Sequence, residues 1–224
     1  HLYAIIGGMP EIVNHYVQHK DLLALNPVFD ALLTSYLDDV EKYAKNDTQV
    51  MHLRHVIRSS FTEAGKRIHF EGFGNSAYRS REMGECLRIL EKAMLVHLLY
   101  PNTSATLPIQ PDIKKSPRLQ LLDTGMLNYF TGIRKEIIGT EDLSSVYKGL
   151  IIEHLTGQEL IATRFDALSE LVFWVREKKE STAEVDFLYT YESKIIPIEN
   201  KSGKTGTLRS LHQFMELAPH QMAV

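Results

Sequence analysis

Three short runs of β-forming residues lie close together near the C-terminal end of the chain, between two segments with helical spacing. The runs are 171-LVFWVRE-177, 184-EVDFLYT-190 and 194-KIIPIENK-201, and the helical segments are 144–165 and 207–218. Helix, three strands and helix within so short a stretch are typical of one sheet with helices packed on it. The C-terminal part is therefore predicted to be a sheet domain of the α/β type.

The N-terminal half of the chain has the spacing of helices. The pattern in 11–45 predicts two helices, and 48–65 predicts a third. Segment 80–101 starts with a basic amphipathic helix whose predicted N-cap is Ser80. Two short β-rich runs follow, at 95–100 and 118–122. This order is that of a winged helix-turn-helix, but it also fits a small helical domain that packs against its neighbours.

Positive charge is concentrated in the middle of the chain. Residues 50–120 hold 11 Lys and Arg against 6 Asp and Glu, whereas 1–49 hold 3 against 7 and 121–224 hold 11 against 15. A basic segment in an acidic chain is typical of nucleic-acid binding, although a solvated charged face is the commoner origin of such an excess. The candidate nucleic-acid-binding residues are Arg79, Arg81, Arg88 and Lys92.

Composition restricts the surroundings of the chain and its metal chemistry. The longest apolar run, 93–100, is shorter than the roughly 20 residues that span a membrane, so no membrane association is expected. The chain shows no secretory signal pattern, and cytoplasmic localisation is expected. The single cysteine, Cys86, excludes an internal disulfide and a multi-cysteine metal cluster within this chain.

One short motif resembles the end of a phosphate-binding loop. A Walker loop has a glycine separated by four residues from its Gly-Lys-Thr, and that position before 203-GKT-205 is occupied by Ile198. The segment therefore does not match the Walker motif. We predict a turn at 203–206 before the last helix, with Thr207 as the N-cap of that helix.

A second motif, 123-DTG-125, resembles the turn of aspartic proteases. Those enzymes need two such turns, because two carboxylates share one proton, and this chain has a single one. The apolar residues that follow indicate a short helix. Asp123 or Thr124 is therefore predicted to cap that helix.

Four residues of the C-terminal part form a candidate metal-dependent site. Side chains alternate along a strand, so Glu199 and Lys201 are predicted to project from one face of 194–201. A hairpin would bring Asp186 beside Glu199, and two carboxylates are hard-oxygen ligands for Mg²⁺ or Mn²⁺. Lys201 would orient or help deprotonate a water on that metal, and Glu153 would complete the set. A surface ion pair worth ~0–1 kcal/mol is the competing interpretation.

An Asp, a variable gap and Glu-x-Lys, with a helical Glu upstream, are similar to the signature of the PD-(D/E)XK nuclease-like superfamily. Longer sequence segments extend the resemblance over essentially the whole chain. They are 7-GGMPE-11, 118-RLQLLDTGMLNYFTG-132, 149-GLIIEHL-155, 173-FWVRE-177, 184-EVDFLY-189 and 196-IPIENKSG-203. In this order they resemble the C-terminal half of a family of prokaryotic AAA-type ATPases. Members of that family carry a P-loop ATPase, then a winged helix, then a nuclease-like domain of unknown function.

The resemblance implies an α+β or α/β fold in three segments. These are a helical remnant of an ATPase lid at 1–47, a winged helix-turn-helix at 48–116, and a PD-(D/E)XK nuclease-like α/β domain at 117–224, which we expect to be truncated. The catalytic positions of the superfamily fall on Glu153, Asp186, Glu199 and Lys201, with Asp186 and Glu199 as metal ligands. The chain departs from the family at Asn200, where an apolar residue is usual.

Two functional hypotheses of different classes follow. In the first, the chain is the C-terminal fragment of an AAA-type ATP-binding protein that engages nucleic acid, foremost DNA, and cleaves phosphodiesters with Mg²⁺ or Mn²⁺. In the second, it is a non-catalytic regulatory module that docks DNA or a partner protein. In both, ATP is bound only by a region upstream of these residues, since no P-loop motif occurs in them.

Overall fold

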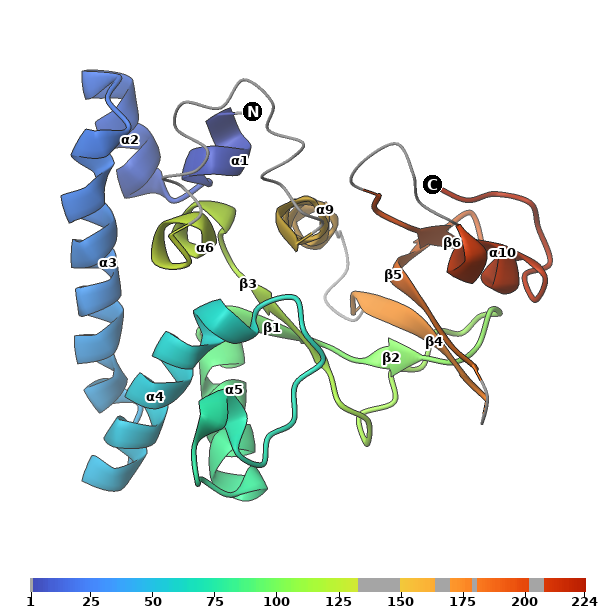
Figure 1. The fold of residues 1–224 in the computed structure, drawn as a ribbon, viewed down its shortest axis with the longest axis horizontal. Coiled ribbons are helices and arrows are strands. Elements are labelled where there is room, and N and C mark those ends of the chain that lie inside the picture. Colours follow the sequence, from blue (N-terminus) through green and yellow to red (C-terminus); the bar gives the residue numbers. More distant parts are fainter. Residues whose placement is uncertain (1, 133–149, 164–169, 179–180, 202–207) are drawn as a thin grey trace. The chain divides into compact units, whose positions relative to one another are not determined.

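The protein has a mixed α+β fold, as expected from the sequence (Figure 1). The chain divides into two compact units, which are described separately. Unit 1 comprises His1–His97 and Leu119–Val146, and unit 2 comprises Leu98–Arg118 and Tyr147–Val224. The computed structural model describes residues 2–132, 150–163, 170–178, 181–201 and 208–224. The predicted division at residues 47 and 116 stays a prediction.

Unit 1 consists mainly of helices. They are α1 (Leu2–Ile6), α2 (Pro10–His19), α3 (Asn26–Asp39), α4 (Asp47–Glu63), α5 (Ser80–Lys92) and α6 (Thr124–Phe130), with the 3-10 turns η1 (Leu23–Leu25), η2 (Val40–Lys42) and η3 (Phe73–Asn75). The chain also pairs β1 (Val96–Leu99) with β3 (Arg118–Leu121) in a two-stranded sheet. The helices predicted within 11–45 and 48–65 are confirmed as α2, α3 and α4.

Side chains satisfy backbone groups at the start of two of these helices. Asn46 accepts a hydrogen bond from the backbone N–H of Gln49 at 3.0 Å and so caps α4. At α5 the predicted cap was wrong by one residue. Arg79 has extended backbone angles and Ser80 is already helical, and the Glu82 carboxylate accepts from the Arg79 backbone N–H at 3.1 Å.

Asp123 joins helices α1 and α6. One carboxylate oxygen accepts from the backbone N–H of Met126 at 2.9 Å, and the other accepts from that of Gly8 at 2.7 Å. The prediction that Asp123 caps a short helix is confirmed. Gly125 approaches Ile6 so closely that a Cβ atom would lie 2.0 Å from the Ile6 carbonyl oxygen, which only a glycine avoids.

Unit 2 contains a four-stranded mixed sheet with the strand order β2-β4-β5-β6. Its elements are β2 (Pro101–Asn102), α9 (Leu150–Ala162), β4 (Val172–Lys178), β5 (Ser181–Tyr191), β6 (Lys194–Ile198) and α10 (Arg209–Met215). Strand β2 is parallel to β4, and the other neighbours are antiparallel. The three predicted strands and the last helix are confirmed.

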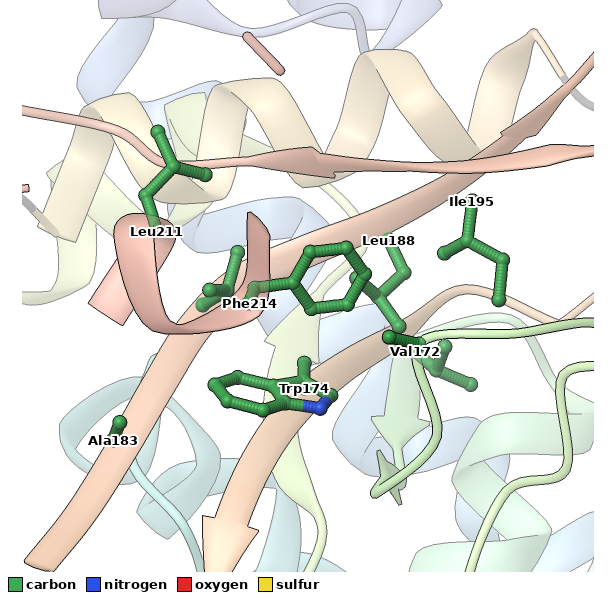
Figure 2. Close-up of a cluster of buried hydrophobic side chains, with 9 residues drawn as sticks. Val172, Trp174, Ala183, Leu188, Ile195, Leu211 and Phe214 are labelled. Atoms are coloured by element: carbon green, nitrogen blue, oxygen red, sulfur yellow. The ribbon is translucent and has the colours of Figure 1, made fainter. Parts of the chain in front are cut away.

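Alternating side chains give this sheet two apolar faces, each covered by one helix. Figure 2 shows the face toward α10, where the buried residues include Val172, Trp174, Leu188, Ile195, Leu211 and Phe214. Trp174 is fully buried, and its ring meets Phe214 edge to face with 5.4 Å between centroids. The opposite face holds Phe173, Val175 and Phe187, against which Leu160 and Ile161 of α9 pack.

Strand β5 has one extra residue opposite β4. Val172 pairs with Leu188 and Trp174 pairs with Val185, so a step of two residues on β4 faces a step of three on β5. Asp186 falls within this bulge. Bulges redirect side chains and are frequent beside functional sites.

Several expectations lie outside the described residues. They are the two ends of the helix predicted at 144–165, the turn at 203–206 and the cap at Thr207. In the ranges that the structure describes, no helix has both the length and the apolar character needed to cross a membrane.

Candidate functional site

Asp186 and Glu199 face each other at the end of the β5–β6 hairpin. The register pairs Phe187 with Ile198, so the next residues outward, Asp186 and Glu199, are opposite. The Asp186 carboxylate accepts a hydrogen bond from the backbone N–H of Asn200 at 2.7 Å. This is the neighbourhood that the sequence predicted, and the chemical role of the pair stays a prediction.

Lys201 binds Glu199 at this end of the sheet, with 2.5 Å between Nζ and Oε1. Strand β6 ends at Ile198, so both residues lie beyond it; their ion pair brings the two side chains together, and their projection from one face of a strand stays a prediction. Beyond the strand, the backbone N–H of Asn200 binds the Asp186 side chain. The contact between Glu199 and Lys201 is therefore made by the loop.

The Glu199 carboxylate is buried and incompletely paired. Only 6% of its side chain is exposed. Oε1 is bound by Lys201, whereas Oε2 has no hydrogen-bond partner among the described residues. A buried polar atom without a partner costs free energy. This oxygen therefore has the capacity to bind a proton donor or a cation.

Arg118 is buried among the acidic residues of unit 2, with 4% of its surface exposed. Its Nη1 donates to Glu153 Oε1, and its Nη2 donates to Glu184 Oε1. Nη1 also donates to the Asp186 backbone oxygen at 3.2 Å. The guanidinium lies over the Phe173 ring, 4.7 Å from its centroid. One cation thus connects α9 with two positions on β5.

Burial and neighbouring charges shift the pKa values of this cluster. Burial raises the pKa of Glu153 to about 7, against the lowering effect of Arg118. Burial also raises the pKa of Glu199, while its hydrogen bond with Lys201 lowers it. The same bond raises the pKa of Lys201. For Arg118 burial lowers the pKa, but the carboxylates of Glu153 and Glu184 outweigh it. Both cations stay protonated, and Glu153 exchanges its proton near neutral pH.

Asn200 connects the loop after β6 with helix α9. Thr156 Oγ1 donates a hydrogen bond to Asn200 Oδ1 at 2.8 Å. The Nδ2 atom of Asn200 is buried and has no partner within the described part of the chain. Glu153 and Thr156 are one turn apart on α9. Asn200 therefore binds the helix that carries Glu153.

The candidate nucleic-acid-binding residues lie in unit 1, on and just before α5. The side chains of Arg79, Arg81, Arg88 and Lys92 are all exposed. The last three are spaced by seven and four residues, which places them on one helix face. Glu85 on the same face forms an ion pair with Lys45, with 2.5 Å between charged atoms.

The donor set of unit 2 suits a hard divalent cation. Asp186 and Glu199 offer carboxylate oxygens, which Mg²⁺ and Mn²⁺ prefer, and Oε2 of Glu199 is available. Mg²⁺ sites commonly use one or two carboxylates and several waters, so this pair fits such an ion. Within the ranges covered by the structure, no group of three or more His, Cys, Asp or Glu side chains is arranged to hold a metal ion.

Sequence reasoning missed Arg118 and Glu184. Glu184 could have been predicted, because it lies two residues before Asp186 on a predicted strand and should project on the same side. Arg118 could not have been predicted, because its carboxylate partners lie 35 and 66 residues away along the chain. No local pattern marks such a contact.

Comparison with protein-family models gives two matches. Residues 148–224 are similar to a model described as "Domain of unknown function (DUF4143)". Residues 1–137 match a model described as "Domain of unknown function (DUF8612)". No curated protein and no solved structure matches the chain. Because the match to residues 1–137 covers more than half of the 224 residues, the chain belongs to the DUF8612 family.

Proposed function

We propose that unit 2 carries a nuclease-like phosphodiesterase site that depends on Mg²⁺ or Mn²⁺. The observation that carries this proposal is the Glu199 carboxylate. It is buried beside Asp186, and one of its oxygens has no partner in the described part of the chain. Lys201 pairs with the other oxygen, and a bound cation would recover the free-energy cost of this unpaired one. The resemblance to the PD-(D/E)XK nuclease-like superfamily supports the same residues.

Each residue has its own task in this proposal. Asp186 and Glu199 would hold the cation, which when bound supplies an activated water and neutralises charge. Lys201 stabilises negative charge that develops on the phosphate, and its raised pKa keeps it protonated for that task. Glu153, with a pKa of about 7, accepts or releases a proton near neutral pH.

The exposed basic surface of α5 supports nucleic acid as the substrate class, because phosphate contacts dominate such binding. Helices α4 and α5 followed by β1 and β3 have the order of a winged helix-turn-helix, whose second helix enters the major groove of DNA. DNA is therefore the substrate that we propose. The resemblance to AAA-type ATPases supports a setting in which ATP is bound by another region of a longer protein.

The test is a calorimetric titration with Mn²⁺. We expect the parent chain to bind Mn²⁺ at a defined site and Asp186→Asn and Glu199→Gln to lose that binding. Glu159→Gln, an exposed position on α9, is the matched control and is expected to bind as the parent does. Absence of Mn²⁺ binding by the parent, or binding that survives both substitutions, would refute the proposal. Mn²⁺-dependent cleavage of DNA by Asp186→Asn would refute the catalytic role.

A non-catalytic docking module is the second candidate, and Arg118 is the observation that favours it. Its guanidinium already forms ion pairs with both Glu153 and Glu184, as in an ion-pair network that serves structure alone. In that case the basic surface of α5 binds DNA or a partner protein without any divalent cation. Binding would be unchanged in EDTA.

Charge reversal on α5 tests this second candidate. The variant replaces Arg81, Arg88 and Lys92 by Glu, and DNA affinity is measured by fluorescence anisotropy over a range of salt concentrations in EDTA. Loss of three phosphate contacts is expected to reduce the salt slope by about 3. Lys114→Glu, an exposed residue outside α5, is the control. DNA affinity that does not depend on salt or on the three charges would exclude DNA docking.

A further inference from the structure

Arg118 is a cation enclosed by the candidate site. Its side chain is 5% exposed, and its two terminal nitrogens bind Glu153 and Glu184 separately. The Cζ atom of the guanidinium lies over the ring of Phe173. A guanidinium is a rigid fork of donors that binds two carboxylates at once, which an ammonium group does less well.

The formal charges of this cluster balance with one divalent cation. Four carboxylates meet two cationic side chains, and the members are Glu153, Glu184, Asp186 and Glu199 with Arg118 and Lys201. With all groups ionised, the sum is two negative charges. Arg118 bridges Glu153 and Glu184, which leaves one negative charge on these three groups, and Lys201 pairs with Glu199, so the second negative charge is that of Asp186.

We propose that Arg118 takes the place of a second divalent cation in this site. It binds Glu153 and Glu184 and offsets one of their two negative charges, which limits the site to a single ion at Asp186 and Glu199. The inference rests on the proposed metal-dependent function. Arg118 is also a positioning residue, since its Nη1 donates to the Asp186 backbone oxygen at 3.2 Å. Without its guanidinium, the carboxylates of Glu153 and Glu184 would bind an ion of their own.

The experiment counts the Mn²⁺ ions bound by the parent and by Arg118→Met. Calorimetry gives the stoichiometry, and the electron paramagnetic resonance signal of free Mn²⁺ checks it. The titration is repeated at several pH values above 7, because the loss of Arg118 raises the pKa of Glu153 further and a bound ion must then displace its proton. We expect one ion for the parent and two for Arg118→Met. Adding Glu184→Gln to that variant is expected to return the count to one, and Arg118→Lys, which keeps the positive charge, is expected to stay at one.

The proposed function and the role of Arg118 are tested by different ion counts. A gain of one ion by Arg118→Met over the parent supports the inference, and equal counts in two folded proteins overturn it. The count for the parent alone judges the proposed function. A parent that binds no ion refutes that function, while the difference between parent and variant still decides the role of Arg118.

Arg118→Met leaves two buried carboxylates unpaired, which destabilises the fold. Arg118→Gln is therefore titrated in parallel, because its carboxamide still donates a hydrogen bond. If either variant is unfolded in EDTA, circular dichroism follows its refolding during the Mn²⁺ titration. Refolding by Mn²⁺ supports the inference, since an ion then replaces the guanidinium. Both variants remaining unfolded in saturating Mn²⁺ would overturn it.

Discussion

Replacing Glu153 by glutamine tests the electrostatics of the cluster without any metal. Burial raises the pKa of this carboxyl from 4.5 to about 7. Such a rise corresponds to about 3 kcal/mol, because the folded protein holds the proton more tightly than the unfolded chain does. Glu153→Gln keeps the size of the side chain and its acceptor oxygen for Arg118, but it removes the proton that titrates.

The direction of the effect follows from where the two states release this proton. The unfolded chain releases this proton near pH 4.5, and the folded protein releases it near pH 7. Between these values folding takes up a proton, so the free energy of unfolding falls as pH rises and levels off above about 7. We expect the parent to lose about 3 kcal/mol across this window that Glu153→Gln does not lose.

The assay is urea denaturation in EDTA, repeated across this pH window and followed by tryptophan fluorescence. Trp174 is the single tryptophan of the sequence and is fully buried in unit 2, so it reports on this unit. The stability of Glu153→Gln minus that of the parent is plotted against pH, which cancels the other titrating groups. Glu159→Gln is the exposed control and should give a flat line.

A flat or falling difference for Glu153→Gln would refute the reasoning. It would mean that the ion pair with Arg118, and not burial, governs the carboxyl of Glu153. The pKa of Glu153 would then lie at or below 4.5, and the group would be unable to exchange a proton near neutral pH. This result would also refute the proton-transfer role proposed for Glu153, but it would leave the metal-ligand roles of Asp186 and Glu199 unaffected.

Three further substitutions test the packing that supports the site. Phe214→Ala should cost about 3–5 kcal/mol in urea denaturation, because the ring is fully buried against the tryptophan. Gly125→Ala should lower Tm more than Gly8→Ala does, since a Cβ atom would lie 2.0 Å from the Ile6 carbonyl oxygen at the first position and at least 3.3 Å from any neighbour at the second. Val224→Pro should lower Tm by about 2–4 °C, because it removes a backbone hydrogen bond donated to β6.

Local patterns were enough to predict the hairpin that brings the two carboxylates together. Strand periodicity marked both runs, and the short connection between them required antiparallel pairing. That pairing sets Asp186 opposite Glu199. Helix signals were similarly local, and Asp123 caps α6 as a residue of that type before an apolar run should.

Contacts between distant parts of the chain could not be predicted in this way. The bulge at Asp186 depends on how β5 packs beside β4, which no single run of letters encodes. The early end of β6 depends on a side chain of β5 that binds the Asn200 backbone. Arg118 lies at the start of an apolar run and would be taken for a surface residue, yet its carboxylate partners bury it.

Asn200 connects two elements of unit 2 through its side chain and its backbone. An apolar residue at this position would pack against α9 and leave the hydroxyl of Thr156 to find another acceptor. Asn200 accepts that hydroxyl instead and gives its backbone N–H to Asp186. One residue therefore connects the helix that carries Glu153 with the strand that carries Asp186, which stabilises the spacing of these two carboxylates.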